Sequence, residues 1–291
     1  MHVHSYYSGF CTVPFINRFC RESYNDPTEV HQLLKKRGMN LFTLSDHDSI
    51  ESAEHVRHLP GFFLSEELTC RMPSGTEVHV GVYDFHERQH PQLQQRRNDL
   101  VSLLMYLTER RLFFSINHVF SSLTGRREAE DFEWFREYFP AVEIRNGHML
   151  PSANSHAKKF AKEWGKIGVG GSDAHAIPSV GLTYTEVRGA RTKEEFFEGL
   201  KSGHGRVRGE SGSFSKLTRD VYMIVYELMR EKYWTAALSP LALLVPVATL
   251  HNYVQEHRFA QRWGPSVLNK FESGKNTSWM SVPHPIAEES L

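Results

Sequence analysis

The sequence predicts an α/β fold in which about seven β/α units form a closed or distorted barrel, followed by a helical C-terminal extension. Short apolar runs alternate with longer amphipathic stretches between residues 28 and 202. Strands that alternate with helices in this way form a parallel sheet covered by helices. The chain has 291 residues, of which 40% are hydrophobic, so it can bury a large core.

The predicted elements follow from this alternation. The strands are rich in Val, Ile, Leu or Phe and span Leu41–Ser45, Phe62–Glu67, Glu77–Phe85, Leu112–Asn117, Ala141–Arg145 and Ile167–Gly170. The helices between them have apolar residues at helical spacing and span Thr28–Arg37, Ser49–Arg57, Gln89–Arg110, Glu128–Tyr138, Ser152–Trp164 and Thr192–Lys201. The glycine-rich segment Gly203–Phe214 is predicted to be a linker.

This pattern divides the chain into a barrel over residues 1–214, a helical extension over 215–265 and a polar, partly disordered tail over 266–291. The extension contains Tyr233–Gln255, which carries no formal charge and is long enough to cross a bilayer. Pro240 and Pro246 disfavour one continuous helix there. Three interpretations remain open: a membrane-spanning helix, a helical hairpin docked on the barrel or on a second copy of the chain, and a membrane-surface segment.

The charge and the cysteine content indicate which partners and which cellular compartment to expect. There are 34 Lys and Arg residues against 34 Asp and Glu residues, so tight binding to duplex DNA through its phosphates is not expected. Cys11, Cys20 and Cys70 form an odd set without a C-x-x-C pair, which argues against a disulfide framework. The N-terminus does not resemble a secretory signal. We therefore expect a cytoplasmic protein, with membrane association left open.

Residues that can bind metals stand at or just beyond the ends of the apolar runs. They are His2, His4, Asp46, His47, Asp48, Glu66, Glu67, His79, His118, Glu143, Asp173 and His175. In a barrel, the carboxyl ends of the strands meet at one rim, so these side chains would converge. Imidazole with carboxylate favours zinc, manganese or iron. The set exceeds the three or four ligands of one zinc ion, which indicates two or three ions.

Each motif also has an ordinary structural interpretation. The Asp46–Asp48 segment could be a turn held by local hydrogen bonds, and His118 could be a buried, hydrogen-bonded histidine. The glycines before Asp173 could simply permit a loop. Several independent structural explanations would have to be true at once, each at a different strand end. One cluster of metal ligands is the simpler interpretation.

Together these motifs resemble the PHP family, the metal-dependent hydrolases named for polymerase and histidinol phosphatase. The resemblance runs from His2 to about Phe214. It rests on His-Val-His, Thr-Leu-Ser-Asp-His-Asp, Ser-Glu-Glu-Leu-Thr, Glu-Val-His-Val-Gly, Asn-His-Val-Phe and Gly-Ser-Asp-Ala-His, in the family's order. It implies a distorted (β/α)7 TIM-like barrel, a trinuclear metal site and hydrolysis of phosphoesters, as in stand-alone phosphoesterases.

The resemblance also implies which residues bind which ion. His2, His4, Glu67 and Asp173 would hold the first ion, and Glu67 would bridge to a second held by His79 and His118. A third would lie between His47 and His175. His86 competes with His79 for its role, and we prefer His79 because it lies in a Val-His-Val run.

Two features depart from the family pattern. The family usually supplies the third metal with an Asp or His where this chain has Gly9 and Phe10. That site would then be empty, labile, or completed by water, phosphate or another residue. His2 also directly follows Met1, so either the first strand is abbreviated or the natural sequence begins earlier.

The chemistry expected of this site is attack of a metal-bridging hydroxide on a phosphoester. Asp173 and His175 are the predicted catalytic residues, with His175 or a metal-bound water as the general acid. Asp46, Asp48 and Glu66 are expected to orient imidazoles from outside the ligand set. The predicted substrate-binding residues are Arg126, Arg127, Arg145 and Asn146. The arginine pair could equally be a solvated helix start.

The predicted function is therefore a metal-dependent phosphoesterase. Its substrate would be a small phosphorylated metabolite, a nucleotide or the end of a short oligonucleotide. Two alternatives remain: a non-catalytic PHP module acting as a scaffold or regulator, and a metal-dependent amide or lactone hydrolase. The predicted partner of Tyr233–Gln255 is a second copy of the chain or a membrane surface.

Overall fold

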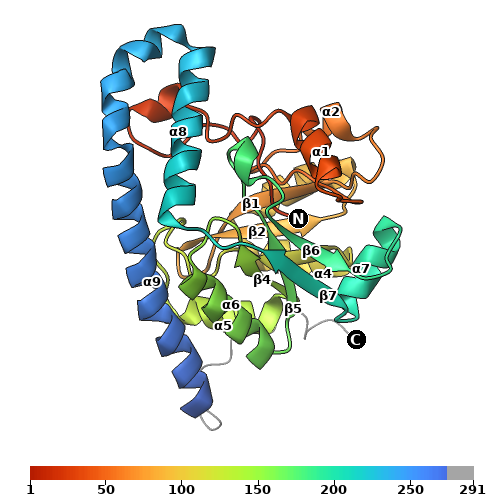
Figure 1. The fold of residues 1–291 in the computed structure, drawn as a ribbon. Coiled ribbons are helices and arrows are strands. Elements are labelled where there is room, and N and C mark those ends of the chain that lie inside the picture. The colour runs from red at the N-terminus through yellow and green to blue at the C-terminus, as the bar shows by residue number, and fades with distance from the viewer. Residues whose placement is uncertain (274–291) are drawn as a thin grey trace, which may run out of the picture.

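The structure, a computed structural model, describes residues 1–273 and has a mixed five-stranded sheet at its centre (Figure 1). The strands lie side by side in chain order. They are β1 (Ser65–Arg71), β2 (Glu77–Tyr83), β3 (Phe113–Ile116), β4 (Ala141–Asn146) and β5 (Ile167–Gly171). The α/β prediction with a helical C-terminal extension is thus confirmed.

The prediction of an all-parallel sheet was wrong for its first half. β1 pairs with β2 antiparallel, β2 with β3 antiparallel, and only β3, β4 and β5 are parallel neighbours. For β1 and β2 the reason is local, because only the turn 72–76 separates them. In this turn Met72 N donates to Thr76 O, and Gly75 N donates to Met72 O. A connection this short can join only antiparallel strands.

Within residues 1–273, a barrel of regular strands is not detected. The predicted strand Leu41–Ser45 is extended chain with isolated bridges only, one of them between Phe42 and Phe62. Residues 2–4 are also extended and pair with the segment that directly follows β5, where Asp173 N donates to His2 O (2.8 Å). Ser45 N donates in turn to Val3 O (2.8 Å), and His47 forms a bridge with Glu67 of β1. These two irregular segments link the outer edges of the sheet.

Helices cover the sheet and the irregular segments 2–4 and 42–48, and they bury their apolar faces in three clusters of the core. They are α1 (Pro27–Lys36), α2 (Ala53–Val56), α3 (His90–Arg96), α4 (Leu100–Glu109), α5 (Ala129–Tyr138), α6 (Pro151–Glu163) and α7 (Lys193–Lys201), with short 3-10 turns η1 (Ile16–Arg18), η2 (Glu87–Gln89) and η3 (Ile177–Ser179). The predicted helix Gln89–Arg110 is divided because Asp99 caps α4, its carboxylate accepting from Ser102 N.

The predicted linker Gly203–Phe214 instead contains a strand. β7 (Gly205–Gly209) pairs antiparallel with β6 (Thr183–Val187) to form a separate two-stranded sheet. A close approach explains one of its glycines, because a Cβ on Gly209 would lie 2.0 Å from Leu182 O.

The C-terminal extension is a helical hairpin of α8 (Phe214–Glu231), η4 (Tyr233–Leu244) and α9 (Val245–Ser273) (Figure 1). α9 packs on α6 and contributes Ala260, Trp263 and Val267 to the main core. Pro240 lies inside η4, which separates the two long helices. The segment Tyr233–Asn269 is long and apolar enough to cross a membrane, and only 17% of its most apolar window is buried. The predicted tail starts within α9, and its part from 274 onward lies outside the described residues.

The contact between β5 and the N-terminal segment gives a first prediction. A Cβ on Gly171 would lie 2.4 Å from His2 N and 2.4 Å from His2 Cβ. Gly171→Ala should therefore displace His2 and lower the free energy of unfolding by about 1–3 kcal/mol, measured by denaturant titration. Gly168→Ala on the same strand is the control, because the atoms nearest to its Cβ would belong to the side chain of Ile144, which can move. Equal losses in both variants would contradict the prediction.

Candidate metal centre

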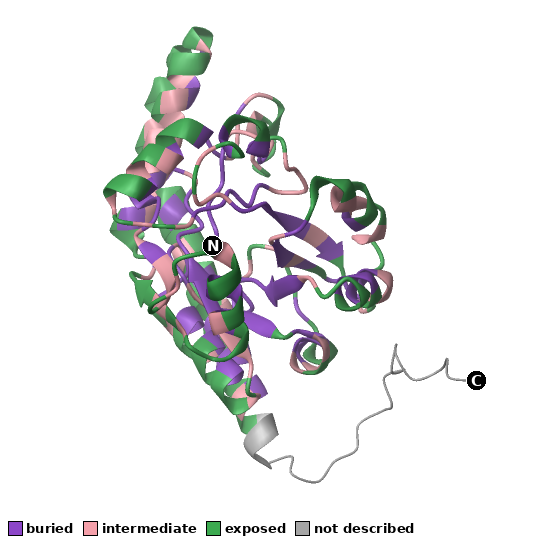
Figure 2. Cartoon of the chain, turned by 90° about the vertical axis from the view of Figure 1, so that its right-hand side faces the viewer, coloured by how far each residue is buried: buried purple, intermediate pink, exposed green. Residues whose placement is uncertain are grey.

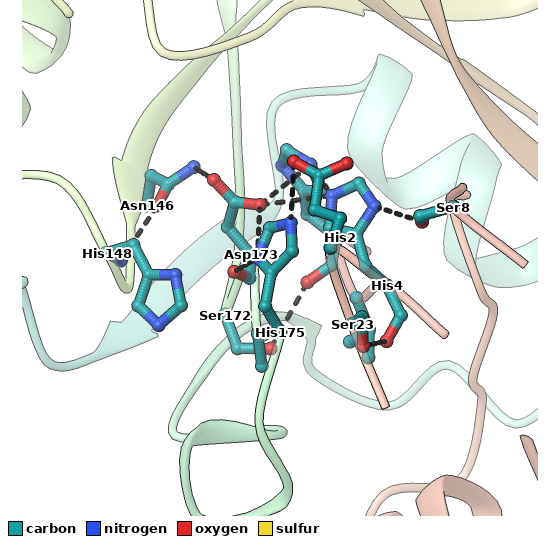
Figure 3. Close-up of polar contacts among 12 residues, drawn as sticks. His2, His4, Ser8, Ser23, Asn146, His148, Ser172, Asp173 and His175 are labelled. Atoms are coloured by element: carbon teal, nitrogen blue, oxygen red, sulfur yellow. Dashed lines mark hydrogen bonds and ion pairs between the residues drawn. The ribbon is translucent and has the colours of Figure 1, made fainter. Parts of the chain in front are cut away.

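The predicted metal ligands converge at one end of the sheet, and Figure 3 shows His2, His4, Asp173 and His175 close together there. All of the ligands except Glu67 and His79 lie in irregular segments. His118 and Asp173 follow β3 and β5, and both have positive φ (28° and 50°). Such backbone is uncommon outside glycine and typical of functional sites. Glu67 and His79 lie within β1 and β2. His86, the alternative to His79, caps η2 at the surface and does not contact the cluster.

The first ligand set consists of His2, His4, Glu67 and Asp173, all of which are buried. His2 Nε2 lies 3.0 Å from His4 Nε2, 3.1 Å from Glu67 Oε2 and 3.4 Å from Asp173 Oδ1. His4 Nε2 lies 3.4 Å from Glu67 Oε2 and 3.1 Å from Asp173 Oδ1. Ligands at 2.0–2.1 Å from a tetrahedral ion are roughly 3.3–3.4 Å apart. The four side chains therefore fit one cation.

The orientation of these two imidazoles supports the same conclusion. His2 Nδ1 lies 2.9 Å from Glu143 Oε1, and His4 Nδ1 lies 2.9 Å from Ser8 Oγ, which donates to Asp46 Oδ1 at 2.8 Å. When both Nδ1 atoms donate, the two Nε2 atoms present lone pairs to each other. Two lone pairs at 3.0 Å repel unless a cation or a proton lies between them.

Glu67 joins the first set to a second. Its Oε2 lies 3.4 Å from His47 Nδ1 and 3.5 Å from His79 Nδ1, and its Oε1 lies 3.3 Å from His118 Nε2. His79 Nδ1 and His118 Nε2 are 3.2 Å apart. The Glu67 side chain is 1% exposed, and Asn117 Nδ2 donates to Oε1 at 2.8 Å. One carboxylate thus faces two groups of imidazoles, as a bridging ligand would.

A third group contains His4, His47 and His175, whose nearest ring nitrogens lie within 4.8 Å of one another. His175 Nδ1 donates to Asp173 O at 2.9 Å, so only Nε2 is free to bind a cation. The same nitrogen cannot also act as a general acid, and the two roles predicted for His175 exclude each other. Glu22, which the sequence did not indicate, lies beside His47 and His175.

The electrostatics of the cluster divide its histidines into two kinds. Burial opposes the charge of His4, but hydrogen bonds with Asp173 and Glu67 outweigh it and raise the pKa of His4 to about 10. His47 lacks such bonds, and burial with the nearby charge of His4 lowers its pKa to about 3. Burial would raise the pKa of Asp173, yet the charges of His2 and His4 hold it well below its usual range. The carboxylate remains ionised.

The three residues predicted to orient imidazoles behave differently from one another. Asp46 does so through Ser8, as described above. Glu66 and Asp48 do not contact the cluster. Glu66 alternates with Glu67 on the strand, so it faces the other side, where it accepts from Gln94 and lies 2.9 Å from His90 Nδ1. Asp48 accepts from Thr69 N and Arg97. Glu143 orients His2 instead. A carboxylate inside an apolar strand was the feature of the sequence that could have indicated this role.

The predicted substrate-binding residues are engaged elsewhere. Arg126 is mostly exposed beside Glu128, and Arg127 is buried and donates to the carbonyls of Glu77 and Arg126. Arg145 Nη1 donates to Gly209 O. Asn146 Nδ2 donates to Glu143 Oε2 and to Asp173 Oδ2, so it positions carboxylates of the cluster. Contact of these four residues with a substrate remains a prediction that the described contacts do not favour.

His148 is a further residue that the sequence did not indicate. Its ring stacks on that of His175 at a centroid distance of 5.8 Å, and its Nε2 lies 2.9 Å from Asp220 Oδ2. Asp220 is a buried residue of α8 and also accepts from Ser179 Oγ. Since α8 lies in the C-terminal extension, this chain of contacts connects the extension to the rim of the cluster.

The outer contacts of His2 give a second prediction. Glu143→Gln should weaken metal binding by about 10–100-fold, because the side chain that fixes the orientation of His2 loses its charge. Competition with a chelating dye would measure the dissociation constants. Glu66→Gln is the matched control, since Glu66 is equally buried but does not contact a ligand. Unchanged affinity in Glu143→Gln would contradict the prediction.

Residues 151–204, which include Asp173 and His175, match the family model described as PHP-associated. The chain contains a PHP-associated domain. The structure is similar to PsfC from Pseudomonas syringae PB-5123, with a TM-score of 0.54, 17% identity, and coverage of 79% of this chain and 96% of PsfC. It is also similar to PfuEndoQ, a lesion-specific endonuclease from Pyrococcus furiosus, with a TM-score of 0.50 and 14% identity.

The second similarity covers 71% of this chain and 56% of PfuEndoQ. At these identities the likeness shows the fold alone. No curated protein matches the chain. The PHP resemblance of the sequence is confirmed, and the buried His, Asp and Glu groups are where that resemblance implies metal ligands.

Proposed function

We propose that this chain is a metal-dependent phosphoesterase of the PHP family that acts on a small phosphorylated metabolite, a nucleotide or the end of a short oligonucleotide. The observation that carries the proposal is the Glu67 carboxylate between two groups of imidazoles. Divalent ions bound there would lower the pKa of a water molecule and neutralise charge on a phosphoryl oxygen. We further propose that residues 2–4 and 42–48 take the place of two strands of a distorted barrel.

The residues of the chain then have separate tasks. Glu67 and Asp173 stay ionised and would hold the cations, while Glu143 and Ser8 fix His2 and His4 with their Nε2 atoms directed inward. Asn146 holds Asp173 through its second oxygen. With Nδ1 of His175 bonded to a carbonyl, that residue acts as a ligand and the leaving group takes its proton from solvent.

The test is a phosphoester screen with the untagged full chain, after its metal content has been measured. Turnover of p-nitrophenyl phosphate, bis-p-nitrophenyl phosphate or a dinucleotide is expected in zinc or manganese, and chelation should abolish it. Metal-loaded protein that is inert towards the whole panel would favour the scaffold or regulator. Turnover of carboxamides or lactones without phosphoesters would favour the amide or lactone hydrolase.

A further inference from the structure

The third group of the metal centre lacks the acidic residue that the PHP pattern places at Gly9 or Phe10, and the chain folds so as to bring another acid there. Residues 9–22 form a loop that doubles back on itself. Phe10 forms a bridge with Arg21, and Cys11 N donates to Cys20 O at 3.0 Å. The next contact along this loop is Glu22 N donating to Gly9 O at 3.0 Å. Glu22 is therefore the direct spatial neighbour of Gly9.

The side chain of Glu22 lies between two histidines of the centre. Its Oε2 is 3.6 Å from His47 Nε2 and its Oε1 is 3.5 Å from His175 Nε2. His175 Nε2 is buried and has no hydrogen-bond partner. Both distances are too long for a strong hydrogen bond but suit two ligands of one ion.

Charge supports the same assignment. Each carboxylate oxygen of Glu22 faces one imidazole nitrogen, and a Glu side chain is ordinarily ionised at neutral pH. A carboxylate with two imidazoles is a ligand set that suits zinc, manganese or iron.

We propose that Glu22 is the acidic ligand of a third divalent cation, which it binds together with His47 and His175. The inference rests on the proposed metal centre, but it does not depend on which reaction the centre catalyses. In this proposal the loop 9–22 has a function. It places the carboxylate of Glu22 beside Gly9, where the motif that begins at His2 lacks an acidic residue.

The experiment counts ions in the full chain. Wild-type protein and Glu22→Gln would be loaded with Mn²⁺ or Zn²⁺, passed through a desalting column and analysed by mass spectrometry of the metal. Wild-type protein should hold three ions per chain and Glu22→Gln two. The affinity of the third site should fall by more than the roughly 10–100-fold that is typical when an outer contact is lost.

Two further variants make the result specific. Glu231→Gln is the matched control, because Glu231 is the partner of Arg21 in the same region and lies outside the cluster. Glu22→His replaces one ligand type by another and should restore the third ion. Wild-type protein that holds only two ions, or a Glu22→Gln variant that binds three with unchanged affinity, would overturn the proposal. If Glu22→Gln loses one ion but the wild-type enzyme turns over no phosphoester, the proposed function fails and the ligand assignment stands.

A second inference concerns the end of the helical hairpin, where most of the chain is exposed or half-buried (Figure 2) and several exposed residues are apolar. Tyr233 is 87% exposed and Leu243 is 79% exposed. The surface also includes Trp234, Leu238, Leu241, Leu244, Val247 and Leu250. The loop that carries η1 adds Phe10, Val13 and Phe15, and it contacts the hairpin through Phe19 and Trp234, whose rings are 5.1 Å apart. We call this surface the apolar tip.

The residues around the apolar tip indicate its partner. The segment from Tyr233 to Gln255 carries no formal charge, whereas the region just before it does. The cations in that region are Arg230 and Lys232, the anions are Glu227 and Glu231, and the loop that carries η1 adds Arg18 and Arg21. Aromatic residues beside an apolar surface with a basic border are typical of segments that lie in a membrane interface. We propose that the apolar tip binds the surface of an anionic lipid bilayer.

Co-sedimentation with phosphatidylcholine vesicles, with and without phosphatidylglycerol, tests this proposal on the full chain. We expect binding that increases with the anionic lipid and falls by at least about tenfold in a Leu241→Glu, Leu243→Glu double variant. Met105→Glu is the control, since Met105 is an exposed apolar residue of α4. Absence of binding to either vesicle would overturn the proposal. So would a dimer that the double variant dissociates, because the tip would then bind a second copy of the chain.

Discussion

Glu67→Gln is expected to remove the two cations that we propose share this carboxylate and to reduce phosphoester turnover by on the order of 10³-fold or more, since each ion would contribute several kcal/mol to the reaction. The reason is geometric. Glu67 lies within 3.5 Å of nitrogens from His2, His4, His47, His79 and His118. An amide of the same shape has no charge and offers only one acceptor oxygen, so it cannot bridge.

The control for this variant is its neighbour in the strand. Glu66→Gln changes an equally buried carboxylate on the opposite face of β1 and should leave metal content and turnover unchanged. Both variants would be compared by metal analysis, by steady-state kinetics and by thermal unfolding. Retention of all ions in Glu67→Gln would contradict the bridging role. If Glu67→Gln loses its ions but the wild-type protein turns over no phosphoester, the metal centre is supported and the proposed reaction is not.

The sequence predicted much of this cluster because polar residues interrupt apolar runs. His118 and Asp173 follow short buried strands, and a side chain at a strand end must lie at the edge of the sheet. The direction of the strands was harder to predict. Pro73, Ser74 and Gly75 form a turn signal between β1 and β2, which favours a hairpin over a crossover. The β/α alternation in the rest of the chain favoured a parallel sheet more strongly than this turn favoured a hairpin.

Glu22 could not be predicted in the same way. It lies in an irregular loop, thirteen residues after Gly9, and no periodicity connects its position to His47 or His175. Its place is set by backbone hydrogen bonds between distant parts of one loop, which no local pattern reveals. The contact of Asp220 with His148 belongs to the same class, since it depends on how α8 packs against the rim.

Binding of the first cation should release protons, so the affinity for metal should increase with pH. In the metal-free protein the pKa of His4 is about 10 and those of His2 and His118 are raised, because bonds and charges from Glu67, Asp173 and Glu143 outweigh the effect of burial. His4 therefore carries a proton at neutral pH that a cation must displace. His47, with a pKa of about 3, is already neutral and releases none.

Each displaced proton should strengthen binding about tenfold per pH unit up to the folded pKa of the group. The same raised pKa values stabilise the metal-free fold below the ordinary histidine pKa, near 6.5, and that stabilisation is lost as the pH rises towards 10. The increase in Tm on adding metal should therefore grow between pH 6 and pH 8. Calorimetry in buffers of different ionisation enthalpy would count the protons. An affinity that stays constant over this range would show that the inward nitrogens are already unprotonated in the metal-free protein.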